Sequence, residues 1–225
     1  MAEARKQMGV RITPPEAPGT SEVADAAPVL ESGEVVEDVR LRDASLADVA
    51  AAGVRLERVE MDRVSFARAR LARAVVLDAR LTGCDLAGSR WERAHLGRVV
   101  MEGCRLVGAD FSRGTLADLR MREVNAEMAN FVSAAFTAAR LERCNLRGAS
   151  FEGADLRGVV FRDCDLRNAD LRGCKLDGTD LRGSQIGGLA LGAAGPRGLI
   201  LDPSQALDIV EQLGATVRPL DDGED

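Results

Sequence analysis

A large apolar residue returns at every fifth position over most of this chain. The frame runs without an insertion from Leu41 to Leu191, and its central position is almost always Leu, Phe, Met, Val, Ile or Trp. A second column, two residues before each centre, is filled mainly by Ala and Val and contains all 5 cysteines. Two columns of constrained size in one fixed frame indicate a repeat of five residues.

Neither a continuous α-helix nor a continuous strand can bury this pattern. Five residues advance an α-helix by about 500°, so successive centres would spiral around it. Along one strand the side chains alternate between faces, so an odd spacing sends neighbouring centres to opposite sides. The pattern fits short extended pieces separated by bends, and Gly is frequent two residues after the centre, as at Gly148 and Gly153. We therefore predict a β-solenoid, stabilised coil on coil.

The motifs of the repeat carry a family resemblance. CNLRG at 144–148, ADLRG at 154–158 and 169–173, and CDLRN at 164–168 resemble the A(D/N)LXX consensus of the pentapeptide-repeat family. The resemblance implies an all-β fold, a right-handed quadrilateral β-helix in which four pentads make one coil. The 31 pentads from Leu41 to Leu191 would then make nearly eight coils.

The two ends of the chain do not follow the frame. Residues 1–37 contain scattered Pro and Glu without periodicity, and we expect a disordered N-terminal tail there. The repeat places the solenoid at 38–195. Residues 196–219 predict a helical segment, and residues 220–225 an acidic tail.

The helical segment has start signals and an apolar stripe. Asp202 is a candidate N-cap, Pro203 suits the first helical position, and Gln205 completes a capping-box pattern. Because a solenoid end exposes its core, this helix would cap the last coil. The gyrase-binding branch of the family is similar in layout, which implies a homodimer joined through this segment, and the two roles are compatible. The candidate cap or dimer residues are Leu207, Val210 and Leu213.

The sequence offers little for catalysis. The single histidine, His95, lies at an outward position without a nucleophile beside it, and a filled rod has no cleft for a small-molecule substrate. The cysteines occupy the small inward column, where we interpret them as small apolar core residues, although the spacing of stacked pairs would permit a disulfide. They are Cys84, Cys104, Cys144, Cys164 and Cys174. We predict a protein that is not an enzyme and has no cofactor or metal.

Charge and hydropathy constrain the location and the partners. The net charge is −6, no apolar run approaches the roughly 18 residues of a membrane span, and the N-terminus lacks the apolar region of a secretory signal. We expect a cytoplasmic protein with no membrane partner. Residues 40–193 hold 25 basic and 21 acidic residues, a net charge of +4, so the acidity lies in the tails.

Two surface features are candidate interaction sites. The first is an arginine cluster with a spacing of one coil, formed by Arg70, Arg73, Arg90, Arg93 and Arg113. It is either a solvated, partly paired face or a docking site for an acidic protein or phosphate. The second is a low-charge band at 125–139, which is either ordinary solenoid wall or a protein contact. Its outward candidates are Met128, Val132, Ser133 and Thr137.

These observations favour a non-enzymatic, rigid scaffold for protein–protein interaction. The alternative, implied by the family resemblance, is a DNA mimic that binds and modulates DNA gyrase, as in topoisomerase protection or quinolone resistance. The rod lacks the global acidity of such a mimic. A third hypothesis is direct nucleic-acid binding through the arginine cluster, which would weaken steeply with salt, although the acidic balance of the whole chain argues against nonspecific binding to nucleic acid.

Overall fold

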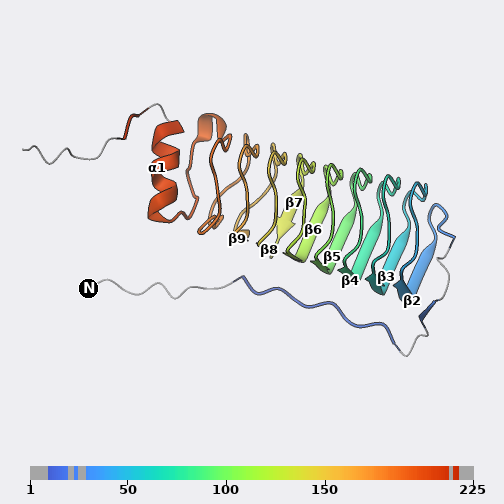
Figure 1. Ribbon diagram of the computed structural model, residues 1–225. Helices are drawn as coiled ribbons and strands as arrows, with labels where there is room; N and C mark the ends of the chain where they lie inside the picture. The colour runs from blue at the N-terminus through green and yellow to red at the C-terminus, as the bar shows by residue number, and fades with distance from the viewer. Residues whose placement is uncertain (1–9, 20–22, 25–28, 213–214, 218–225) are drawn as a thin grey trace, which may run out of the picture.

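The computed structural model describes residues 10–19, 23–24, 29–212 and 215–217. Figure 1 shows an elongated solenoid with β2 near one end and the helix α1 at the other. In the described part of the chain, the strands form one nine-stranded parallel sheet in the order β1-β2-β3-β4-β5-β6-β8-β9, with β7 also paired to β6. The predicted 220–225 tail and Leu213 lie outside the described residues.

The strands are short and recur along the chain. They are β1 (Val23–Ala24), β2 (Val35–Arg42), β3 (Arg55–Asp62), β4 (Val75–Thr82), β5 (His95–Glu102), β6 (Thr115–Arg122), β7 (Ala135–Thr137), β8 (Arg140–Glu142) and β9 (Val160–Arg162). A 3-10 turn, η1 (Gly192–Ala194), and the helix α1 (Pro203–Gln212) follow. Within the described chain, no helix is long and apolar enough to cross a membrane.

The register repeats after every fourth pentad, as expected for a coil with four sides. Arg55 of β3 lies beside Val35 of β2 and Val75 of β4. On the other sides of the rod, where no longer strands form, isolated parallel bridges keep the same offset, from Ser45 with Ser65 to Asp180 with Ile200. The predicted all-β β-solenoid with a short C-terminal helix is confirmed.

Each pentad bends at the residue two places after its centre. Every such residue from Asp38 to Gly188 has a positive φ, whether or not it is glycine; Arg73, for example, has a φ of 59°. The left-handed conformation costs an L-residue about 1–2 kcal/mol, so the bend is enforced by hydrogen bonds between coils, such as Asp43 N–H to Asp62 O at 2.9 Å. We call these positions corners.

The centres and the small column fill the axis of the rod. Trp91 stacks on Phe111 with ring centroids 5.9 Å apart, and the interplanar angle is 11°. Phe131 continues the stack, 5.7 Å from Phe111 and 5.0 Å from Phe151. The Trp91 indole N–H donates to the buried Ser89 hydroxyl at 2.8 Å. Large side chains one coil apart therefore pack face to face, which makes the rod interior continuous.

The coils extend beyond both predicted boundaries. Strand β2 begins at Val35, and the Gly33 N–H already donates to Ala52 O at 2.9 Å. At the other end, pairing resumes after η1, since the Ile200 N–H donates to Thr179 O at 2.8 Å. The 38–195 limits followed the side-chain frame, whereas backbone pairing persists where the frame has faded.

Residues 10–19 differ from the expected disordered tail. They lie along the outside of the rod, across the strands β2 to β6, and are held there by hydrogen bonds to aspartate side chains of the rod. The absence of apolar periodicity led to the expectation of disorder. The segment is ordered instead by its polar backbone contacts to the rod wall.

Candidate interaction surface

The coil register brings the predicted arginine cluster together on one side of the rod. Arg73, Arg93 and Arg113 occupy corners of successive coils, with φ values of 57–59°. Arg70 lies beside Arg90 through a parallel bridge. All five side chains are exposed. We call these five residues the arginine face.

The guanidinium groups of the arginine face make no hydrogen bond or ion pair with any other residue that the structure describes. Arginines at other corners do pair. Arg63 binds Asp43 at 2.6 Å, and Arg143 binds Glu123 at 2.7 Å. In each case the carboxylate stands at the same corner of the preceding coil. Arg73, Arg93 and Arg113 have no such carboxylate at the corner of the preceding coil, so their guanidinium groups stay outside ion pairs in the described structure.

The low-charge band is not one surface. Val132 and Ser133 belong to the pentad that follows Arg113 one coil later, and the Arg113 N–H donates to Val132 O at 2.8 Å. Met128 and Thr137 belong to the pentads before and after, so they lie on neighbouring sides of the rod. The band thus wraps around most of one coil, and only Val132 and Ser133 adjoin the arginine face.

Two carboxylates next to the arginine face, those of Asp110 and Glu92, interrupt its positive charge. Asp110 lies beside Arg90 in the bridge column, and its Oδ1 accepts the Ser112 N–H at 2.8 Å. Glu92 precedes Arg93 in the chain, and its backbone carbonyl accepts the Arg73 N–H at 2.8 Å. The face is therefore a set of separate cations rather than a uniform basic strip.

The C-terminal helix contacts the last coil through a different face from the predicted one. Leu207 and Val210 are 52% and 40% exposed, whereas Ile209 is 5% exposed and belongs to the core. Gln205, four residues before Ile209, is buried with it, as the spacing of one helical turn requires. The predicted stripe thus points away from the rod, and dimerisation through it stays a prediction.

Gln205 connects the start of α1 to the end of the solenoid. Its Oε1 accepts the Asp202 N–H at 3.0 Å, and Asp202 Oδ1 accepts the Gln205 N–H at 3.1 Å, which is the predicted capping box. Its Nε2 donates to Leu181 O and Ser184 O, both at 2.6 Å. The Ser204 hydroxyl, followed by the backbone N–H of Gly183, lowers the pKa of Asp202 to about 2.

A second charged column, which the sequence reasoning missed, runs through the middle of strands β2 to β6. Asp38, Arg58, Asp78, Arg98 and Asp118 stand at the same corner of five successive coils, all with positive φ. Arg58 Nε donates to Asp38 Oδ1 at 2.7 Å, and Arg98 Nε to Asp78 Oδ1 at 2.6 Å. We call these five residues the Asp–Arg column.

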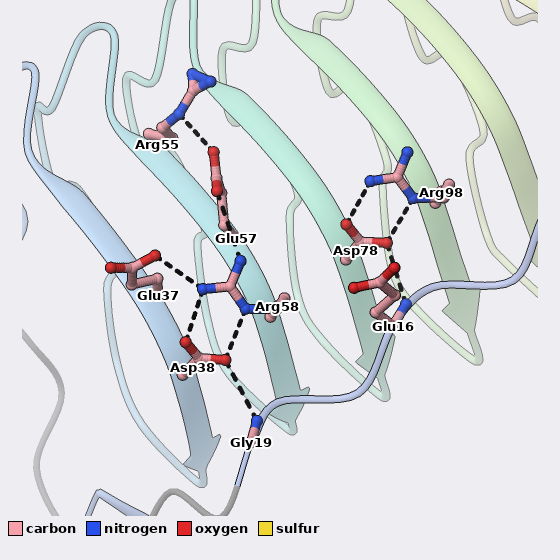
Figure 2. Close-up of polar contacts among 9 residues, drawn as sticks. All are labelled: Glu16, Gly19, Glu37, Asp38, Arg55, Glu57, Arg58, Asp78 and Arg98. Carbon is pink, nitrogen blue, oxygen red and sulfur yellow. Dashed lines mark hydrogen bonds and ion pairs between the residues drawn. The ribbon is translucent and has the colours of Figure 1, made fainter.

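The N-terminal segment binds every aspartate of this column (Figure 2 shows two of the three contacts). The Thr13 N–H donates to Asp118 Oδ1 at 2.8 Å. The Glu16 N–H donates to Asp78 Oδ1 at 3.1 Å, and the Gly19 N–H to Asp38 Oδ1 at 3.3 Å. Hydrogen bonds, first from Arg58 and then from Gly19, lower the pKa of Asp38 to about 2.

The remaining candidates for chemistry are dispersed. Cys84, Cys104, Cys144 and Cys164 are buried free thiols, and Cys174 is half-buried, where burial raises its pKa to about 11. His95 is exposed. Among the described residues, no group of three or more His, Cys, Asp or Glu side chains could hold a metal ion. A space of ≈ 10 Å³ beside Trp91 is at the lower limit for one water molecule.

Family models and solved structures agree with this architecture. The model for pentapeptide repeats matches residues 144–183 in 8 copies, and the model for a pentapeptide repeat region matches residues 74–151. No curated protein matches the chain. A trypsin-treated variant of QnrB1, a plasmid-mediated fluoroquinolone resistance protein, is 23% identical with a TM-score of 0.51, covering 84% of this chain and 98% of its own.

Two further structures are similar at lower scores. Full-length QnrB1 is 22% identical with a TM-score of 0.47, covering 82% of this chain and 92% of its own. HetL, a pentapeptide repeat protein involved in heterocyst differentiation regulation from the cyanobacterium Nostoc sp. strain PCC 7120, is 22% identical with a TM-score of 0.34; the match covers 76% of this chain and 90% of HetL. At these identities the likeness concerns the fold alone. Together with the unbroken frame of five residues, the matches establish that the chain belongs to the pentapeptide-repeat family.

Proposed function

We propose that this protein is a non-enzymatic scaffold whose arginine face binds an acidic surface of a partner protein. The observation that carries the proposal is that, within the described structure, no hydrogen bond or ion pair engages the guanidinium groups of Arg70, Arg73, Arg90, Arg93 and Arg113. Like charges stacked one coil apart repel one another, and a carboxylate-bearing partner relieves that repulsion.

The pattern of the face favours discrete carboxylates over a continuous polyanion. A phosphate backbone lying along Arg73, Arg93 and Arg113 would also meet the carboxylates of Glu92 and Asp110. Carboxylates on a protein surface can meet each guanidinium separately, in bidentate geometry. Val132, at the end of the face, adds apolar area of the kind found in protein interfaces.

The test replaces the corner arginines by the residue that a positive φ favours. In the variant Arg73→Gly, Arg93→Gly, Arg113→Gly, each glycine relieves backbone strain, so the rod is expected to stay folded. Binding of a short labelled polyglutamate peptide, measured by fluorescence anisotropy at low salt, is expected to weaken about tenfold, since exposed ion pairs contribute about 0.5 kcal/mol each. The wild-type affinity should fall as salt is added.

The matched control removes the same charge elsewhere. In Arg63→Gly, Arg68→Gly, Arg143→Gly, the three arginines also occupy corners with positive φ but pair with Asp43, Asp48 and Glu123. Its affinity for polyglutamate is expected to stay within about twofold of the wild type. An equal loss in both variants, or tighter binding of a short DNA duplex than of polyglutamate, contradicts the proposal.

A second candidate function is modulation of DNA gyrase by mimicry of DNA. The similarity to the fold of QnrB1, named as a fluoroquinolone resistance protein, favours it. The pairing of rod carboxylates with arginines weakens it, because paired carboxylates present little net negative charge; Asp48 with Arg68 and Asp78 with Arg98 are examples. Under the scaffold proposal, a large molar excess of the protein leaves supercoiling by purified gyrase unchanged. If the protein inhibited supercoiling and added DNA relieved the inhibition by competition, the DNA-mimic function would replace the scaffold proposal.

A further inference from the structure

The contacts of residues 10–19 repeat every third residue. Ile12 and Pro15 are half-buried and Pro18 is buried, while the residues between them are exposed. Each of these inward residues is followed directly by a backbone donor to the rod, at Thr13, Glu16 and Gly19. A period of three is the period of the polyproline II helix, whereas a strand has a period of two.

The sequence of the segment suits that conformation. Pro14, Pro15 and Pro18 have a fixed φ close to that of polyproline II and occupy positions whose N–H is not needed. The three residues that do supply an N–H to the rod are all non-proline. Proline also biases the residue before it toward the same extended region. The order T-P-P-E-A-P-G therefore keeps a backbone N–H at each of the three positions that meet an acceptor of the rod, and proline removes it at three of the four other positions.

The lengths of segment and column agree. Asp118 and Asp38 lie four coils apart, which is about 19 Å at a strand spacing of about 4.8 Å. Thr13 and Gly19 are six residues apart, also about 19 Å in polyproline II at about 3.1 Å per residue. One turn of polyproline II thus matches two coils, the interval between aspartates in the column. An α-helix of six residues would span only about 9 Å.

The arginines of the column hold two of its three carboxylates, those of Asp38 and Asp78, in position for this contact. Arg58 holds both oxygens of Asp38, at 2.7 Å each, and Arg98 holds Asp78 in the same way. Asp38 Oδ1 and Asp78 Oδ1 each retain a lone pair, which accepts the peptide N–H (Figure 2). Alternation of sign avoids repulsion along the column and leaves one oriented acceptor for every two coils.

We propose that the Asp–Arg column is a docking track for an extended, proline-rich peptide that presents a backbone N–H at every third residue. In this structure the track is occupied by the chain's own residues 13–19. The same peptide chemistry in another molecule competes for it when the resident segment is released. This surface lies on a different side of the rod from the arginine face.

The test uses the full chain with the resident segment weakened. The variant Thr13→Pro, Glu16→Pro, Gly19→Pro removes the three donors and retains a backbone that favours polyproline II; a Cβ at Gly19 would meet Asp38 Oδ1 at 3.9 Å, an ordinary contact distance. A labelled peptide VRITPPEAPG, the sequence of residues 10–19, is expected to bind this variant at least tenfold more tightly than the wild type. In the wild type, the tethered segment competes at high effective concentration.

Two substitutions identify the track. Adding Asp78→Ala to the variant is expected to weaken peptide binding at least tenfold, because it removes a charged acceptor. Adding Asp163→Ala, an aspartate at a corner with the same positive φ but outside the column, is expected to change it less than twofold. Equal binding of the peptide to wild type and variant, no binding to the variant, or equal effects of the two substitutions would overturn the proposal.

Discussion

The variant Phe131→Ala is expected to unfold with a free energy about 3–5 kcal/mol lower than the wild type. Phe131 is 1% exposed and lies in the middle of the aromatic stack, with ring centroids 5.7 Å from Phe111 and 5.0 Å from Phe151. The coils above and below are tied to it by backbone hydrogen bonds, so they cannot close over the space that alanine leaves. Urea unfolding followed by circular dichroism measures the change.

The control for this prediction lies in the same coil. Met128 is 69% exposed, and Met128→Ala is expected to change the free energy of unfolding by less than about 0.5 kcal/mol. The fluorescence of Trp91, which is separated from Phe131 in the stack by the ring of Phe111, should report the same transition as circular dichroism. A loss below about 1 kcal/mol for Phe131→Ala would mean that the coils relax around the cavity and that the stack does not hold them.

The variant Gln205→Leu is expected to release α1 from the end of the rod. The side chain keeps its approximate size but loses its amide, so the carbonyls of Leu181 and Ser184 lose the Nε2 donor and the Asp202 N–H loses the Oε1 acceptor. Each buried polar group left without a partner costs about 1–3 kcal/mol. Amide hydrogen exchange in α1 is expected to accelerate by at least a hundredfold, equivalent to about 2.7 kcal/mol.

The control is the reverse exchange, leucine to glutamine, on the exposed face of α1. It distinguishes the loss of contacts with the rod from a change in helix propensity. Leu207 is 52% exposed, so Leu207→Gln is expected to leave α1 docked, with exchange within about threefold of the wild type. If Leu207→Gln released the helix as well, the predicted stripe of Leu207 and Val210 would be in contact after all, most simply in a homodimer. If amide exchange in α1 stayed slow in both Gln205→Leu and Leu207→Gln, the contact of Ile209 with the core would be what holds the helix on the last coil.

The fold was predictable because one rule repeats. The size of each centre and of the residue two before it specifies inward and outward positions, and an odd spacing excludes helix and strand for all pentads together. The capping box at Asp202 and Gln205 was predictable for a similar reason, since it depends on residues three apart. The contact face of α1 was not, because Ile209 and Leu207 are both apolar and only the position of the last coil selects between them.

The ion pairs along the charged columns could have been predicted from the sequence. Once a coil is taken to hold four pentads, each corner can be compared with the corner four pentads earlier. Arg58 and Arg68 then meet Asp38 and Asp48, with which they pair, whereas Arg73 meets Gly53. The same offset would have revealed the alternating Asp–Arg column. That residues 13–19 occupy this column was harder to foresee. It depends on the match between one polyproline II turn of three residues and the distance across two coils, and this match is seen only when the two lengths are compared.

The corner residues determine the outer surface of the rod, whereas other residues fill its interior. A corner backbone adopts the same bend with Gly148, Arg93 or Asp118, and the side chain there contributes nothing to the axis of the rod. Exchanging one corner residue for another therefore alters the outer chemistry at a cost of about 1 kcal/mol and leaves the interior intact. A lineage with this architecture can acquire, shift or discard a partner one substitution at a time, without passing through an unfolded intermediate sequence.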